Sequence, residues 1–294
     1  MYRLQGIIPA MVTPFKKDYS INDNLIPELF DFFVDGQVDC VLVCGSTGEY
    51  TLLTKEERKK VIELSVKASG GRVPVMAGTG YHGTMETIEM TRFAQEAGAD
   101  CALVITPHYL KPSEAALIEH YQKVAESVDI PIVIYNWPGG TGVSVTVNMV
   151  KELSGVKNII GIKNTASQED TNTFINVTMD REFDVAAGWE TLLLPTLACG
   201  GSGGVGVAFN AVPGLIKALF NAFKVEGDIQ KAQELHNGLL PLINTILSEP
   251  SPGPVKAAME IIGIPVGSPR MPIKPASENV KNQLKKQLKD LGVI

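Results

Sequence analysis

The chain has 294 residues, of which 45% are hydrophobic and 20% are charged, and its formal net charge at pH 7 is −6. This composition is typical of a soluble globular protein with a large core. The sequence argues against nucleic-acid binding, because no run of Lys and Arg interleaved with aromatic residues is present. It also argues against a membrane-spanning helix, because no apolar stretch approaches the roughly 18–20 residues of a membrane span.

Short apolar, β-branched segments recur at intervals of roughly 20–35 residues, with amphipathic helical segments between them. Most of these segments are continuously apolar, as is typical of parallel strands that are covered on both faces. Strands are predicted at residues 6–12, 40–44, 73–77, 101–105, 130–135, 159–162, 183–187 and 204–209. Eight strands that alternate with helices predict an α/β fold of the (β/α)₈ type, the TIM barrel.

Helix signals fit the same alternation. Residues 54–57 form a capping box, and Pro112 with Ser113 begins another helix whose apolar face has the 3.6-residue period. After Pro213 the pattern is helical only, with helices predicted at residues 215–225, 229–248, 255–262 and 278–291. We therefore expect a catalytic barrel over residues 1–226 and a C-terminal helical bundle over residues 227–294.

The N-terminus and the cysteines bear on location. Residues 1–6 lack the basic, apolar and small-residue stages of a signal peptide. The cysteines (Cys40, Cys44, Cys101 and Cys199) show no CxxC spacing, so we expect small, reduced, buried core residues and not a disulfide framework. The sequence thus predicts a cytoplasmic protein.

Lys163 is the most unusual lysine of the chain, because it ends an apolar strand. In TIM barrels the catalytic groups lie at the C-terminal ends of the strands. A lysine there loses hydration, which lowers its pKa and leaves more of the neutral amine that attacks a ketone to form an imine. From position alone, a lysine whose ammonium reaches out into solvent explains the sequence as well.

The neighbours of Lys163 favour the imine. Tyr135 ends the preceding strand, and its phenol is suited to moving protons at the same site, although a core aromatic is an equally simple interpretation. Ser46 and Thr47 lie in a tight glycine-bounded loop whose backbone N–H groups suit a carboxylate, although such loops are common as plain turns. Together these residues indicate a site for a 2-oxo acid.

Two other signals fail. Residues 201–206 match the pattern GxGxxG, but they follow a predicted helix and lead into a strand, which is the reverse of a dinucleotide-binding motif. The four histidines form no HxH or HxxxH set, so a zinc site is not expected. We expect no metal and no nucleotide cofactor.

Several motifs in the right order resemble the dihydrodipicolinate synthase/N-acetylneuraminate lyase family of pyruvate-dependent class I aldolases. The resemblance covers essentially the whole chain. Its motifs are residues 9–15 (PAMVTPF), 45–49 (GSTGE), 135–142 (YNWPGGTG), 161–165 (GIKNT) and 252–256 (PGPVK).

The resemblance implies an enzyme of this family, without metal or nucleotide, that self-associates as a dimer or tetramer. It implies that Lys163 forms the Schiff base, that Tyr135 relays protons, and that the backbone N–H groups of Ser46 and Thr47 hold the pyruvate carboxylate. It further implies that Tyr109 reaches across a dimer interface to complete a hydroxyl relay with Thr47 and Tyr135.

Departures from the family pattern bear on the substrate. Synthases carry an arginine where this chain has Gly140, and the loss of a guanidinium removes the best partner for a second carboxylate. The site through which lysine inhibits synthases of the enteric type also differs. This chain has Lys55, His82 and His108 where those enzymes carry His, Asn and Tyr. The resemblance then favours an aldolase or dehydratase of 2-keto-3-deoxy sugar acids.

The far end of the substrate pocket follows from the same resemblance. Sialic-acid lyases bind the glycerol tail with acids after the seventh strand and a serine near the eighth, which this chain matches only in part, with Gly188, Trp189, Glu190 and Val207. We expect these four residues to line the distal pocket, with Trp189 as a stacking face and Glu190 as a hydroxyl acceptor.

Alternative functions remain open at this stage. Within the family they are 4-hydroxy-tetrahydrodipicolinate synthase, which joins pyruvate to aspartate semialdehyde, and N-acetylneuraminate lyase. Outside it, the glycine-rich approach to the eighth strand allows a phosphate-binding barrel isomerase. A non-catalytic barrel that acts as a sensor is a third class.

Overall fold

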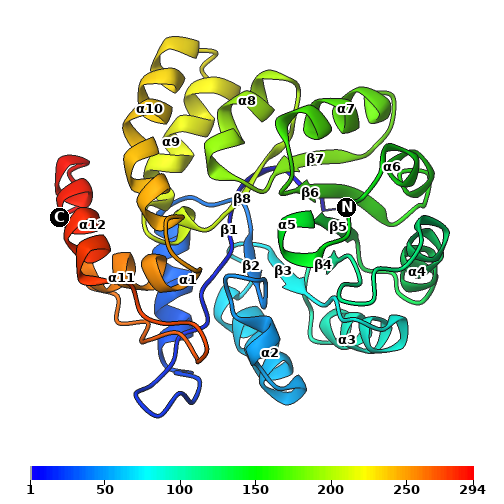
Figure 1. The fold of residues 1–294 in the computed structure, drawn as a ribbon, viewed down its shortest axis with the longest axis horizontal. Helices are drawn as coiled ribbons and strands as arrows, with labels where there is room; N and C mark the ends of the chain where they lie inside the picture. Colours follow the sequence, from blue (N-terminus) through cyan, green and yellow to red (C-terminus); the bar gives the residue numbers. More distant parts are fainter. Residues whose placement is uncertain (1) are drawn as a thin grey trace.

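Eight parallel strands form the centre of the computed structural model, which describes residues 2–294 (Figure 1). From β2 to β8 each strand pairs with the next, and β8 pairs with β1. A parallel bridge between Ala10, directly after β1, and Leu42 of β2 joins the two remaining strands. The ring is thereby closed, which confirms the predicted barrel. The strands are β1 (Gly6–Pro9), β2 (Val41–Val43), β3 (Val75–Gly78), β4 (Cys101–Ile105), β5 (Ile132–Asn136), β6 (Ile159–Asn164), β7 (Asp184–Ala187) and β8 (Gly203–Gly206).

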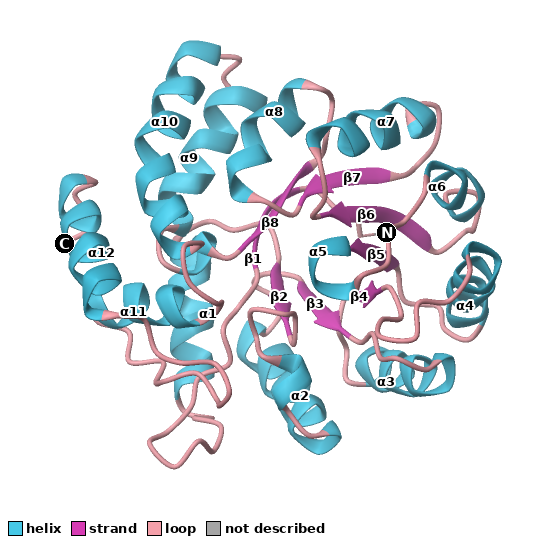
Figure 2. Ribbon diagram, in the orientation of Figure 1, coloured by secondary structure: helices cyan, strands magenta, loops and turns pink. Residues whose placement is uncertain are grey.

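Helices surround this ring on the outside (Figure 2). They are α1 (Leu25–Asp35), α2 (Lys55–Ser69), α3 (Thr84–Glu96), α4 (Glu114–Glu126), α6 (Val147–Leu153), α7 (Gln168–Thr178), α8 (Leu193–Ala198) and α9 (Pro213–Lys224). The predicted capping box of α2 is present, because Thr54 accepts from the backbone N–H of Glu57 and Glu57 accepts from that of Thr54.

The C-terminal segment forms α10 (Ile229–Ile246), α11 (Gly253–Ile261) and α12 (Glu278–Asp290), which lie together on one side of the barrel (Figure 1). The four predicted C-terminal helices therefore match α9 to α12 to within two residues at each end. No helix among the described residues is long and apolar enough to cross a membrane.

The continuously apolar strands reflect two hydrophobic layers. In β5, Val133 and Tyr135 belong to the cluster inside the barrel, whereas Ile132 and Ile134 belong to the cluster between the strands and the helices. Successive side chains of a strand point to opposite faces. Tyr135 therefore points into the barrel, close to the C-terminal ends of the strands.

Two strand predictions were too long and one cysteine prediction was wrong. β1 ends at Pro9, and β8 ends at Gly206 because residues 208–210 form a 3₁₀ helix, whose first N–H (Ala208) donates to the Glu190 carboxylate at 2.6 Å. Cys199 is exposed in the turn after α8, whereas the other three cysteines are buried as expected.

Candidate active site

Lys163 and Tyr135 lie side by side at the C-terminal ends of β6 and β5, where they are register partners. The Lys163 Nζ lies 4.3 Å from the centre of the Tyr135 ring, and only 6% of the lysine is exposed. Burial lowers the pKa of Lys163 to about 8, against the opposing effect of the nearby Glu190 carboxylate. The side chain is therefore held inside the barrel mouth and not extended into solvent.

The Tyr135 hydroxyl lies beside two other hydroxyls. Burial raises the pKa of Tyr135 to about 12, and the hydroxyls of Ser46 and Thr165 oppose that rise. Both of these hydroxyl oxygens are buried, and neither makes a well-directed hydrogen bond within residues 2–294. The Ser46 hydroxyl is therefore a neighbour of Tyr135, a contact that the expected relay through Thr47 did not include.

Thr165 is a site residue that the sequence reasoning did not single out. It lies two residues after Lys163 and directly beyond β6. Because residues i and i+2 of an extended chain point to the same face, the spacing from Lys163 could have placed Thr165 at the site. Gly188 leaves room for it, because a Cβ at Gly188 would lie 1.8 Å from the Thr165 Oγ1. Gly188 therefore shapes the site through the absence of a side chain.

The substitution Gly188→Ala tests this packing. It is expected to lower the free energy of unfolding by about 1–3 kcal/mol, because the added methyl overlaps the Thr165 side chain in a packed interior. Denaturant unfolding measures the loss. Gly214→Ala serves as the control, because nothing lies within 4 Å of a Cβ there. Equal stability of the two variants would contradict a tight contact between position 188 and Thr165.

The loop after β2 presents free backbone donors, among them those of Ser46 and Thr47. The N–H groups of Ser46 and Thr47 have no acceptor among the described residues. Close packing fixes the loop, because the Thr13 hydroxyl donates to the Gly48 carbonyl at 2.6 Å and a Cβ at Gly48 would lie 3.0 Å from the Met11 carbonyl oxygen. Adjacent N–H groups of this kind suit a carboxylate.

Glu190 is buried close to Lys163. One carboxylate oxygen accepts the Ala208 N–H, while the other, also buried, has no partner within residues 2–294. Burial raises the pKa of Glu190, and Lys163 is among the groups that oppose the rise. Trp189 and Val207, the other residues expected in a distal pocket, are only partly buried.

A cavity of about 350 Å³ opens at this end of the barrel, and Ser46, His108, Trp137 and Gly140 are among the residues that line it. The Trp137 ring lies nearly parallel to that of Tyr135, with centroids 6.3 Å apart. A Cβ at Gly140 would lie 2.5 Å from the indole carbons. The indole therefore fills the space of a side chain at position 140, and no Lys or Arg lines this cavity.

The loop before α4 projects from the same end. Tyr109 is 85% exposed and has a φ of 73°, which is unusual for a residue with a side chain. Beside it, the centre of the His108 ring lies 4.1 Å from that of the His82 ring. Burial lowers the pKa of His108, and the nearby His82 lowers it further by a smaller amount. The Tyr109 hydroxyl is not part of the Tyr135 cluster within a single chain.

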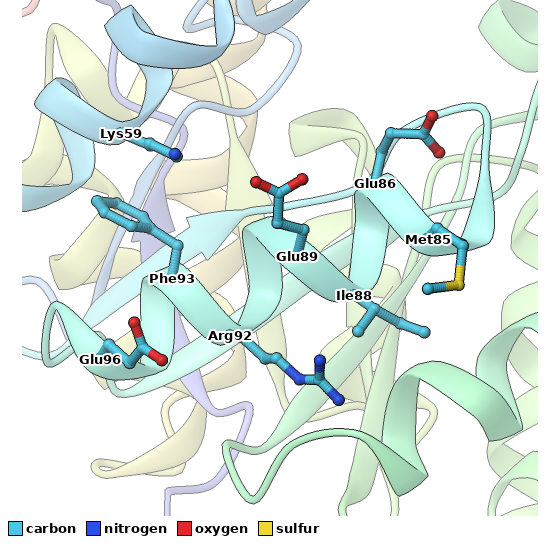
Figure 3. Close-up of a pocket in the computed structure, with 8 residues that line it drawn as sticks. All are labelled: Lys59, Met85, Glu86, Ile88, Glu89, Arg92, Phe93 and Glu96. Atoms are coloured by element: carbon cyan, nitrogen blue, oxygen red, sulfur yellow. The ribbon is translucent and has the colours of Figure 1, made fainter.

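A second hollow lies on the outside of the barrel along α3 (Figure 3). Its volume is about 570 Å³, and it is lined by Lys59, Met85, Glu86, Ile88, Glu89, Arg92, Phe93 and Glu96. None of the predicted site residues lines it. No group of three or more His, Cys, Asp or Glu within residues 2–294 is placed to hold a metal ion.

The chain is similar to known proteins over nearly its whole length. The chain matches the dihydrodipicolinate synthetase family over residues 3–291. It is 41% identical over 291 residues to a protein of Methanococcoides burtonii named 4-hydroxy-tetrahydrodipicolinate synthase, with 99% of each chain covered.

Solved structures show the same fold. A dihydrodipicolinate synthase from Aquifex aeolicus superposes with a TM-score of 0.93 at 38% identity, covering 99% of each chain. A structure described as a monomeric dihydrodipicolinate synthase variant superposes with a TM-score of 0.95 at 31% identity, covering 99% of this chain and 97% of the other.

Proposed function

The chain belongs to the dihydrodipicolinate synthetase family of class I, Schiff-base-forming lyases and aldolases, and from that membership we propose that it acts as a 4-hydroxy-tetrahydrodipicolinate synthase, joining pyruvate to aspartate semialdehyde. The observation that carries the proposal is the buried Lys163, whose pKa is about 8, beside Tyr135 and the free N–H groups of Ser46 and Thr47. The names of the relatives support the synthase over the sugar-acid aldolase that the sequence favoured.

The proposed chemistry starts with pyruvate bound through its carboxylate to the N–H groups of Ser46 and Thr47. The neutral Lys163 amine attacks the ketone carbon to give a carbinolamine, which loses water to give the imine. Loss of a proton from the pyruvate methyl group gives an enamine, whose carbon attacks the aldehyde of the second substrate. No metal or nucleotide takes part in these steps.

We assign proton transfer to Tyr135 and the hydroxyls next to it. The phenol is placed to give a proton to the departing hydroxyl of the carbinolamine and to recover one afterwards. Ser46 and Thr165 supply the adjoining hydroxyls in the same chain. Tyr109 is exposed at the mouth, which suits a residue that completes the relay of a second copy in a dimer or tetramer. Self-association and a cytoplasmic location are part of the proposal.

The direct test is synthesis. Purified protein with pyruvate and aspartate semialdehyde is expected to consume both in equal amounts and to give the cyclic condensation product. No consumption of the semialdehyde, with imine formation intact, would contradict the synthase while leaving the aldolase chemistry in place.

One observation favours a second candidate, an aldolase or dehydratase of 2-keto-3-deoxy sugar acids. The Trp137 indole fills the space at Gly140, and no Lys or Arg lines the mouth cavity to bind a second carboxylate. An indole face also packs well against the C–H groups of a sugar chain. Release of pyruvate from 2-keto-3-deoxygluconate, measured beside the condensation assay, separates the two candidates.

The pH dependence of imine formation tests the role of Glu190. The rate of imine formation with pyruvate is expected to rise as the pH passes through about 8, because only the neutral Lys163 amine attacks. Glu190→Gln removes a negative charge that raises the pKa of Lys163, so the midpoint should move to lower pH. The measurement is the rate of borohydride-trapped adduct against pH, and a midpoint that stays in place or rises would contradict this role.

A further inference from the structure

Glu49 directly follows the loop that presents the Ser46 and Thr47 N–H groups, and its carboxylate is held by the C-terminal segment. The Lys256 Nζ, in α11, lies 2.7 Å from one carboxylate oxygen, as an ion pair and not a well-directed hydrogen bond. The backbone N–H of Arg270 donates to the other oxygen at 2.7 Å. We propose that Glu49, Lys256 and Arg270 form a positioning unit that keeps this loop in its pyruvate-binding geometry.

The backbone of Glu49 closes this loop. Its N–H donates to the Ser46 carbonyl at 3.0 Å and closes the turn that leaves the Ser46 and Thr47 N–H groups free. Its φ is 59°, in the left-handed region that a residue with a side chain adopts only when its surroundings hold it there. The contacts of the Glu49 carboxylate with Lys256 and Arg270 are placed to hold this backbone conformation.

The ion pair between Lys256 and Glu49 is deeply buried, and stability alone does not explain a buried ion pair. Lys256 and Glu49 expose 2% and 1% of their side chains. Removing two charges from water is costly, and apolar residues of similar size often stabilise such a position equally well. Lys256 is also placed over the Phe15 ring, with its Nζ 4.2 Å from the ring centre, which fixes the ammonium opposite the loop.

Arg270 extends the unit to the next element. Its guanidinium pairs with the Glu57 carboxylate, and it donates to the Leu52 carbonyl at 2.8 Å. Arg270 thereby joins the chain on either side of the α2 N-terminus to the C-terminal segment. Residues of that segment, including Ser251 and Ile273, also line the mouth cavity. The C-terminal segment thus helps to form the cavity at the mouth of the barrel and is not only an appended bundle.

The inference rests on the proposed pyruvate site, and it predicts a selective loss of pyruvate affinity. In Lys256→Met and in Glu49→Gln, half-maximal borohydride trapping should need about 10-fold more pyruvate or greater, which corresponds to about 1.4 kcal/mol of binding. At saturating pyruvate the amount of trapped adduct should be unchanged, because neither residue touches the reacting atoms. The double variant should lose little more than either single variant, since both remove one ion pair.

Lys217→Met is the matched control. Lys217 also pairs with a carboxylate, that of Asp39 at 2.6 Å, and also lies over a ring, that of Phe220 at 5.2 Å. Asp39 accepts the N–H of Ile7 near the start of β1, at the opposite end of the barrel from Lys163. Lys217→Met should therefore change thermal stability without changing the pyruvate requirement.

The outcomes separate the inference from the proposed function. Normal trapping by the unsubstituted chain, with a pyruvate requirement in Lys256→Met and Glu49→Gln within twofold of it, would overturn the positioning unit alone. An equal loss of pyruvate affinity in Lys217→Met would also overturn it. Unfolding of both Lys256→Met and Glu49→Gln, while Lys217→Met stays folded, would overturn it by indicating a general structural role. An unsubstituted chain that traps no pyruvate would overturn the proposed function and this inference together.

Discussion

Replacing Lys163 by alanine is expected to lower kcat by at least about 10³-fold, whichever second substrate is used. The substitution removes the amine that lies beside Tyr135 inside the barrel mouth, and without an imine the pyruvate methyl group is not activated. The measurement is the steady-state rate of pyruvate consumption or release, with circular dichroism to show that the barrel is intact.

Lys123→Ala is the control for this variant, because Lys123 is an exposed lysine of α4 paired only with Glu119 one turn away. Its rate should match that of the unsubstituted chain, since exposed pairs of this kind contribute little even to stability. A folded Lys163→Ala variant that keeps more than about a tenth of the activity would remove the central residue from the mechanism.

Tyr135→Phe is expected to lower kcat by about 10²–10³-fold while keeping the fold and most of the pyruvate affinity. The ring that packs inside the barrel is retained, and only the hydroxyl that lies beside Ser46 and Thr165 is lost. The loss should therefore fall on the proton-transfer steps and not on binding. Steady-state kinetics with pyruvate as the varied substrate separate kcat from KM.

Thr165→Val is the companion to that experiment. If Thr165 belongs to the hydroxyl cluster, its loss should lower kcat by a smaller factor than Tyr135→Phe, and the double variant should be less than additive, because both act in one relay. A Tyr135→Phe variant with unchanged kcat and a raised KM would indicate a packing role for the ring and would contradict the relay.

The sequence was sufficient for the barrel because both faces of each strand are buried. Apolar runs such as Cys101–Ile105 are bounded by polar residues, here Asp100 and Thr106, so their limits are marked in the sequence. Where the predicted ends failed, a contact from elsewhere in the chain decided them. β8 stops before Ala208 because the distant Glu190 accepts that N–H, and no local pattern records this contact.

The candidate site divides in the same way. Lys163 and Tyr135 were predictable, because each ends an apolar strand and the barrel topology brings those ends together. Thr165 was within reach by its spacing from Lys163, but the neighbour of the Tyr135 hydroxyl (Ser46 or Thr47) depends on the turn geometry of one loop. The resemblance assigned this place to Thr47, and the Ser46 hydroxyl was not part of that expectation.

Contacts between distant residues were beyond the sequence. Nothing in the segment that contains Lys256 indicates that its ammonium meets Glu49, some two hundred positions earlier. The same holds for Gly140, which was interpreted as a missing arginine, whereas the structure shows that the Trp137 indole takes the space. The substrate question therefore turns on a packing relation and not on one absent charge.

Peptide mapping after borohydride reduction in the presence of pyruvate shows whether Lys163 forms the imine. We expect one adduct per chain, with the mass of a reduced pyruvate, on the peptide that contains Lys163, and none in Lys163→Ala. An adduct on another lysine, or full activity without any adduct, would contradict the imine at Lys163 and the mechanism built on it.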